Sequence, residues 1–386
     1  AMDVHGGKGV MMGPNNYLGR GYMATPIAIT VEGANILTRS LIIYGQGAIR
    51  CHPFVLRELH AAGDEDYDRG LIEFDDALFG HIGYAISNMA RSFFLALTHA
   101  KFSQVPLNTP TRRYYQNINR YSAAFALASD FAMLTLGGDL KRRELLSARL
   151  GDILSAMYLA SCVLKHFENE GRRATDLPLV EWSVRTLMYQ AQESLHEFLL
   201  NIPNRWVSWF LRFFIFPRGR TYKNPSDELG QKVVALMTTP GESRERLSKY
   251  AYTTLEPGNP IGKLQEALEL SKENAPLEKR LRQASKEGLI ASDYLGLQID
   301  EAEKAQVISK AEANSLRDYY EKVAALLDVD DFAAGEFVGG SASTAPVAQP
   351  RKAPKEPDAK KAAGKKKPAA KKASSKKVNK KKTTKA

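Results

Sequence analysis

The sequence has few of the features that mark exported, metal-binding or membrane-spanning proteins. Its 386 residues contain two cysteines, Cys51 and Cys162. They are too few for a disulfide framework and too far apart for a cysteine metal site, which fits a reducing compartment. No charged segment followed by an apolar one marks a secretory signal. No run approaches the roughly 20 apolar residues that a membrane-spanning helix needs. We therefore expect a cytoplasmic protein.

Regular alternation of apolar and polar residues, the pattern of a half-buried strand, is also missing. Apolar residues instead recur every three or four positions, which is the spacing of one helix face. This spacing predicts long helices over residues 74–97, 121–131, 146–164 and 179–200. Ser309 and Glu312 have the pattern of a capping box and predict a further helix that reaches Leu327. The predicted fold class is therefore all-α, a helical bundle.

The first 66 residues have a different composition. Six glycines and two prolines predict an irregular structure over residues 1–30. A short helix is expected over residues 35–44, with a break at residues 45–47 and renewed helix toward Leu59. The acidic residues 63–66 are expected to form a surface turn at a domain boundary.

The formal charge of +11 is unevenly distributed along the chain. From Arg351 onward, fifteen lysines and one arginine face two carboxylates, which gives this segment +14 and leaves −3 for residues 1–350. Residues 339–386 are rich in Ala, Pro, Ser and Lys and cannot bury enough apolar area to offset their ordering entropy, so we expect a disordered tail. Such a tail is suited to contact polyanions without sequence preference. Specific nucleic-acid recognition is not expected, because the tail has no aromatic residues for base stacking.

One carboxylate, that of Glu32, is the strongest candidate for chemistry. It precedes Gly33 and an expected helix, and a helix start offers free backbone N–H groups to a developing oxyanion. This setting suits removal of a proton next to a carbonyl. From the pattern alone, an exposed charge that complements the helix dipole is the simpler interpretation. The seven histidines have no carboxylate or second ligand at a useful spacing, so no metal site is expected.

Several runs of residues nevertheless form a recognisable set. DVHGGKG occupies residues 3–9 and VEGANIL occupies residues 31–37. Further runs are RSLIIYGQGAIRCHP at 39–53, LFGHIGY at 78–84, IFP at 215–217 and VDDF at 329–332. Together they resemble the last part of the acyl-CoA dehydrogenase family, and more narrowly its long bacterial branch from fatty-acid β-oxidation. The resemblance covers about residues 1–335 and is strongest in the first 60.

This resemblance implies an FAD-dependent oxidation of medium-chain or long-chain acyl-CoA to trans-2-enoyl-CoA. Glu32 would be the base that removes the α-proton of the thioester, and Gly33 would contact the substrate. A dry site would raise the pKa of the Glu32 carboxyl toward working pH. The implied partners are acyl-CoA, an electron-transfer flavoprotein or another electron acceptor, and further copies of the chain in a homo-oligomer.

The resemblance also implies which residues contact FAD. Asp3, His5, Gly6 and Gly7 would form one edge of the cofactor site, with the glycine backbone near the adenosine pyrophosphate. Glycine suits that position because a β-carbon would obstruct the phosphates. Many family members have Gln at the position of Asp3.

The implied domains are the end of the catalytic helical domain at residues 1–62, a bacterial-type C-terminal helical domain at 63–338, and the tail at 339–386. By the family pattern, a helical domain and a β-barrel that hold most of the flavin would precede Ala1. We therefore expect the chain to be a fragment or the product of a truncated gene model. The isolated polypeptide should show no flavin absorbance and no dehydrogenase activity.

The aromatic segment at residues 206–216 has two interpretations. It contains six aromatic residues and Arg212, which suits either a helix packed between others or a helix lying in a membrane interface. The second interpretation predicts peripheral contact with the inner membrane. It also keeps open a different function, in which the chain is a non-enzymatic helical interaction module whose polycationic tail binds membrane or nucleic acid.

Overall fold

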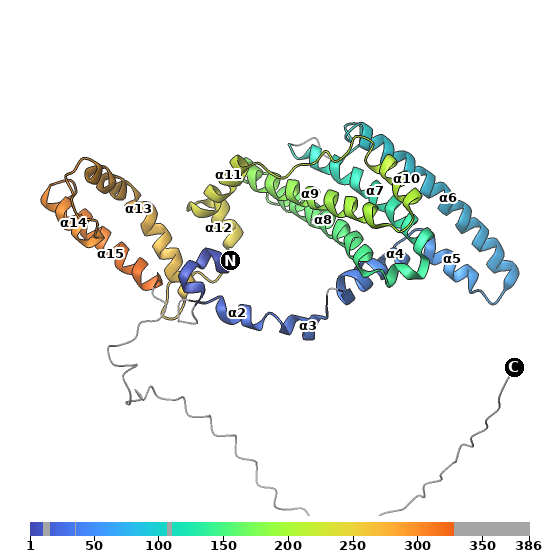
Figure 1. The fold of residues 1–386 in the computed structure, drawn as a ribbon, viewed down its shortest axis with the longest axis horizontal. Coiled ribbons are helices and arrows are strands. Elements are labelled where there is room, and N and C mark those ends of the chain that lie inside the picture. Colours follow the sequence, from blue (N-terminus) through green and yellow to red (C-terminus); the bar gives the residue numbers. More distant parts are fainter. Residues whose placement is uncertain (11–15, 35, 106–109, 328–386) are drawn as a thin grey trace, which may run out of the picture. The chain divides into compact units, whose positions relative to one another are not determined.

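The structure is a computed structural model that describes residues 1–10, 16–34, 36–105 and 110–327 (Figure 1). Within these ranges every regular element is helical, so the predicted all-α fold is confirmed. The predicted disordered tail lies outside the described residues. The helices of the first half are α1 (Met2–His5), η1 (Gly6–Gly9), α2 (Gly19–Ala24), α3 (Ile27–Glu32), η2 (Ile36–Gln46), α4 (Gly47–Arg50), α5 (Val55–Ala62), α6 (Tyr67–Leu97), α7 (Arg112–Leu136), η3 (Gly137–Lys141) and α8 (Glu144–Asn169).

The second half continues with η4 (Ala174–Asp176), α9 (Leu177–Asn201), α10 (Arg205–Ile215), α11 (Asp227–Thr238), α12 (Glu242–Ser248), α13 (Pro260–Lys286), α14 (Leu295–Lys304) and α15 (Lys310–Leu327). The predictions of long helices at residues 74–97, 121–131, 146–164 and 179–200 are confirmed by α6, α7, α8 and α9. The acidic turn is confirmed as well, because Asp66 caps α6 by accepting a hydrogen bond from the backbone N–H of Arg69.

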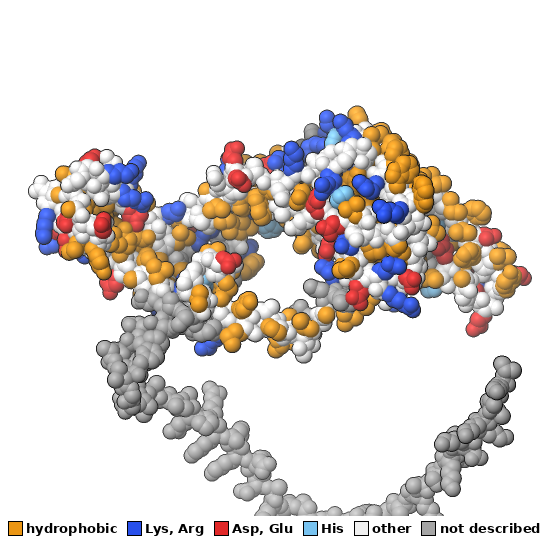
Figure 2. All heavy atoms as spheres, viewed as in Figure 1, with side chains coloured by type: hydrophobic (Ala, Val, Ile, Leu, Met, Phe, Trp, Pro, Cys, Tyr) orange, Lys and Arg blue, Asp and Glu red, His pale blue; other side chains and the backbone are white. Residues whose placement is uncertain are grey.

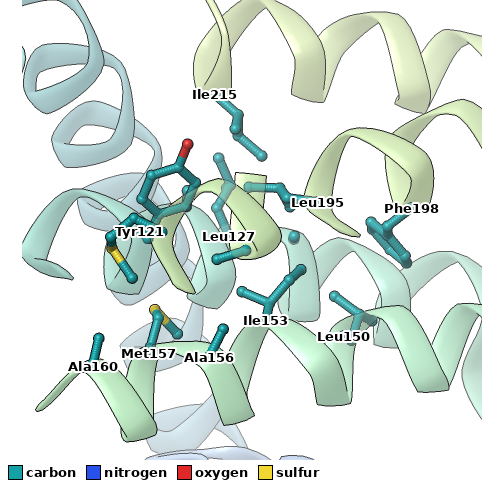
Figure 3. Packing of buried hydrophobic residues seen from close by; sticks show 14 of the residues in the cluster. Tyr121, Leu127, Leu150, Ile153, Ala156, Met157, Ala160, Leu195, Phe198 and Ile215 are labelled. Atoms are coloured by element: carbon teal, nitrogen blue, oxygen red, sulfur yellow. The ribbon is translucent and has the colours of Figure 1, made fainter. Parts of the chain in front are cut away.

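The main hydrophobic core lies between α7, α8, α9 and α10. In α8 the apolar residues that recur every three or four positions are fully or almost fully buried, namely Leu146, Leu150, Ile153, Met157, Ala160 and Leu164. Figure 3 shows Leu150 and Ile153 of α8 near Leu195 and Phe198 of α9, with Tyr121, Leu127 and Ile215 from the neighbouring helices. Because α8 and α9 pack along their lengths, they form the central pair of this bundle.

Two helices correct the expectation that no segment has the length and apolar character of a membrane span. α7 with η3, and α8, both meet that standard by length and composition. Both also supply the core of the bundle, and α7 buries the polar side chains Gln116, Arg120, Ser129 and Asp130 within it. In each of the two helices, 44% of the apolar window is buried within the structure, so helix-to-helix packing uses part of their apolar residues.

A second, smaller core joins α13, α14 and α15. The capping box predicted for the last of these helices is formed. The backbone N–H of Glu312 donates to Ser309 Oγ at 3.3 Å, and the backbone N–H of Ser309 donates to Glu312 Oε2 at 2.7 Å. These two bonds satisfy backbone donors that a helix start otherwise leaves free, so the helix begins after Ser309 as predicted.

Two expectations about the N-terminal region are wrong. Residues 1–30 are mostly helical within the described ranges, although the helices have four to six residues each. The predicted break at residues 45–47 is also absent, because η2 continues directly into α4. The break falls instead at residues 51–54, where Pro53 lacks a backbone N–H for a continuing helix.

The packing of α9 gives a direct test of the core. Leu195→Ala removes a side chain with no exposed area, so we expect the free energy of unfolding to fall by about 2–5 kcal/mol in chemical denaturation. Leu200→Ala is the control on the same helix, where the side chain is more than half exposed, and it should cost less than about 1 kcal/mol. Equal losses in the two variants would contradict the placement of the core.

Candidate active site

Glu32 is the last residue of α3, and Gly33 follows with φ 80° and ψ 165°. This backbone conformation is available essentially only to glycine. A β-carbon on Gly33 would also approach Leu37 Cδ2 to 3.3 Å. The direction of the Glu32 side chain lies outside what the structure describes.

The position of Glu32 corrects one part of the sequence argument. We expected it at the start of a helix, where free N–H groups face a ligand. The expected helix is present as η2, but it begins only at Ile36, and Glu32 itself lies at the end of α3, where free carbonyl groups carry partial negative charge. The helix end that holds Glu32 therefore does not supply the oxyanion donors.

Gly33 and Ala34 line a cleft of about 680 Å³. The rest of its lining is mostly apolar and comes from α2, α3 and the residues between them: Tyr22, Met23, Thr25, Pro26, Ala28 and Ile29. The residue after the candidate base therefore borders an apolar hollow. Such a hollow is suited to an acyl chain or thioester rather than to a charged ligand.

The helix η2, which follows Glu32 and Gly33 in the chain, packs against the bundle. The Tyr44 side chain is buried in the main core, its hydroxyl lies 3.4 Å from Ser129 Oγ, and burial raises its pKa above the usual range. Arg39 pairs with Asp152 of α8 at 3.0 Å. Gly151 permits this close packing, because a β-carbon there would approach Arg39 Cγ to 3.2 Å.

The residues expected at the cofactor edge lie together in α1 and η1. Asp3, Gly6 and Gly7 are exposed, and a β-carbon on either glycine would meet no atom within 4 Å. The His5 ring packs against Tyr17 with 4.7 Å between ring centroids, and both of its nitrogens are buried without a hydrogen-bond partner. Burial, followed by the charge of nearby Lys8, lowers the pKa of His5.

These features fit one polar edge of a dinucleotide. The open backbone at Gly6 and Gly7 leaves room for a pyrophosphate, and the unpartnered nitrogens of His5 leave a donor and an acceptor for a ligand. Asp3 adds a negative charge at the same place, which disfavours a phosphate nearby. The fit therefore rests on the glycines and His5 rather than on Asp3.

A second cluster, which the sequence did not predict, joins His52, His81 and Asp130. His52 Nε2 lies 3.0 Å from Asp130 Oδ1, and His81 Nε2 lies 3.9 Å from the same oxygen. Glu58 holds the other nitrogen of His81 at 2.8 Å. Asp130 Oδ2 is buried without a partner. These side chains come from the turn before α5, from α5, from α6 and from α7, so no short motif in the sequence could reveal them.

The atoms of His52, His81 and Asp130 lie within 4.8 Å of one another, which is close enough to consider a metal ion. The hydrogen bonds of His52 argue against one. Its Nδ1 accepts the backbone N–H groups of Phe54 and Val55 at 3.2 and 3.1 Å, so the neutral ring carries its proton on Nε2 and donates it to Asp130. If Nε2 bound a metal, the ring proton would have to lie on Nδ1, where it would face the backbone N–H donors of Phe54 and Val55. This arrangement disfavours a metal site.

Phe54 completes this packing. Its ring stacks on that of His81, with 6.0 Å between centroids and 11° between planes. A β-carbon on Gly80 would lie 2.4 Å from the Phe54 ring, so glycine at this position lets the turn before α5 approach α6. The cluster therefore fixes the start of α5 against α6 and α7.

A comparison with protein families identifies the chain. The family model described as acyl-CoA dehydrogenase, C-terminal, bacterial type, matches residues 49–332. The chain belongs to this family. No solved structure matches the chain.

The matched range of this acyl-CoA dehydrogenase C-terminal domain includes the cluster of His52, His81 and Asp130. It begins after Glu32, Gly33 and the glycines of η1. The roles of those earlier residues therefore rest on the resemblance of residues 3–9 and 31–37 and on the cleft beside Gly33, and they remain proposals.

The cluster predicts a stability effect that a surface histidine would not have. His52→Ala leaves the Asp130 carboxylate buried without its N–H donor, so we expect the free energy of unfolding to fall by about 2–4 kcal/mol. His60→Ala, at an exposed position of α5, is the control and should change it by less than about 0.5 kcal/mol. Denaturant unfolding of both variants is the measurement. A loss below about 1 kcal/mol for His52→Ala would contradict the assigned bond.

Proposed function

We propose that this chain is the C-terminal part of a flavin-dependent acyl-CoA dehydrogenase that oxidises medium-chain or long-chain acyl-CoA to trans-2-enoyl-CoA. The observation that carries the proposal is the family match over residues 49–332. The apolar cleft beside Gly33 supports it, because the residue after the candidate base borders a hollow whose apolar lining suits an acyl chain.

In this proposal Glu32 is the catalytic base. Its carboxylate takes the α-proton of the thioester as the α-carbon–hydrogen bond breaks, and the electron pair of that bond forms the new carbon–carbon double bond. FAD, when bound, supplies the acceptor for the hydride that leaves the β-carbon. The apolar residues of α2 and α3 hold the acyl chain and exclude water from the reacting carbons.

The cofactor edge proposed for this chain consists of His5, Gly6 and Gly7. The glycine backbone would face the pyrophosphate, and the His5 ring would offer one hydrogen bond. The proposed partners are the acyl-CoA substrate and an electron-transfer flavoprotein or another electron acceptor.

The test is a chimera in which the flavin-binding region of an acyl-CoA dehydrogenase precedes Ala1, assayed with an acyl-CoA and an artificial electron acceptor. Glu32→Gln keeps the size of the side chain and removes the base, so kcat should fall by about 10²–10⁴-fold, with FAD content and acyl-CoA affinity little changed. Glu73→Gln changes an exposed carboxylate of α6 outside the proposed site; it is the control and should keep the activity.

Retained activity in Glu32→Gln would contradict the role of Glu32. Activity lost together with FAD binding would mean that the substitution disturbs the fold rather than the chemistry. A folded, flavin-loaded chimera that oxidises no acyl-CoA would overturn the proposed function itself.

A further inference from the structure

The helix α10 turns large aromatic side chains away from the bundle. Leu211 and Ile215 are buried in the core, whereas Trp206 is 82% exposed, Trp209 is 68% exposed and Phe213 is about half exposed. The three exposed residues lie at spacings of three and four and therefore share one face of the helix. Each of the two interpretations of residues 206–216 describes one side of α10. One side packs against the bundle, and the other side presents aromatic rings to the surface.

This face continues onto α6. The Phe93 ring stacks on Phe213 with 5.3 Å between centroids, and Trp209 stacks on Phe213 at 6.5 Å. Figure 2 shows hydrophobic side chains gathered along α6. We name the combined surface the aromatic face and define it by Ile82, Ile86, Phe93, Phe94, Leu97, Phe102, Trp206, Trp209 and Phe213, which are exposed except for the half-buried Phe93. A contiguous apolar surface of this kind marks an interaction site.

The chain segments that form most of the aromatic face carry charges of one sign. Residues 77–101 and 198–226, which include α10 and most of α6, contain no Asp or Glu. They contain seven exposed cations, namely Arg91, Lys101, Arg205, Arg212, Arg218, Arg220 and Lys223. Of these seven cations, only Arg220 forms a salt bridge within the described part of the chain, and its partner is the carboxylate of Glu193.

We propose that the aromatic face binds the surface of an anionic phospholipid bilayer. Trp and Phe side chains insert at the boundary between headgroups and acyl chains, and the arginines around them reach the lipid phosphates. A second copy of this chain fits less well, because it would bring two sets of unpaired cations together. The basic segment after residue 350 adds a second attraction to anionic lipid, and stable membrane association usually needs two such signals.

The test is flotation of the full chain with vesicles of phosphatidylcholine alone and of phosphatidylcholine mixed with phosphatidylglycerol. We expect binding to the mixed vesicles and little to the neutral ones. The variant Trp206→Ser, Trp209→Ser, Phe213→Ser should partition at least about tenfold more weakly. The control variant Tyr158→Ser, Tyr250→Ser, Tyr294→Ser, which removes three equally exposed rings outside the aromatic face, should bind as the original chain does.

The two variants contain the same basic tail, so a difference between them reports on the aromatic face alone. Circular dichroism and thermal unfolding check that both remain folded. Equal binding of the two variants, or equal binding to neutral and anionic vesicles, would overturn the proposal. A third outcome would also overturn it. In that outcome no vesicle binds the chain, and light scattering shows that the original chain and the control variant are dimers whereas the Trp206, Trp209, Phe213 variant is not. The outcome does not depend on Glu32, so it is independent of the proposed dehydrogenase activity.

Discussion

Apolar packing between α8 and α9 is the constraint on which the rest of the bundle depends. Leu150, Ile153, Leu195 and Phe198 have no exposed area, and burying such side chains contributes about 1.5–3 kcal/mol each. Because this pair occupies the centre, α7 and α10 must turn their own apolar residues toward it. Trp206, Trp209 and Phe213 of α10 then face outward, next to the residues of α6 that belong to the aromatic face. The same packing gives η2 a fixed surface for Tyr44, which ties the segment after Glu32 to the bundle.

Much of the bundle could be predicted from the sequence, because its helices carry the information locally. The apolar spacing from Leu146 to Leu164 and the capping box at Ser309 each need only the residues of one helix. The cluster of His52, His81 and Asp130 could not be predicted, because its residues come from the turn before α5, from α6 and from α7, which are far apart in the sequence. The exposure of Trp206 and Trp209 could not be predicted from the sequence either, because periodicity shows which residues share a helix face but not which face is buried.

The candidate active site was predicted by resemblance rather than by spacing. Glu32, Gly33 and the glycines of η1 precede the residues that the family model matches, and local physics corrects part of their expected setting. Glu32 lies at the C-terminal end of α3, and the expected helix, η2, begins only at Ile36, so the end of α3 supplies no donors for a developing oxyanion. The conformation of Gly33 and the apolar cleft beside it are what the structure adds in favour of the proposed site.

The central claim is that the bundle is a rigid support and that acyl-CoA binds beside α3. Hydrogen exchange of the flavin-loaded chimera, with and without an acyl-CoA, tests both parts of it in one measurement. We expect the amides of α8 and α9 to exchange slowest in both states, and residues 27–34 to become protected only when acyl-CoA is present. Protection confined to other helices, with residues 27–34 unchanged, would contradict it.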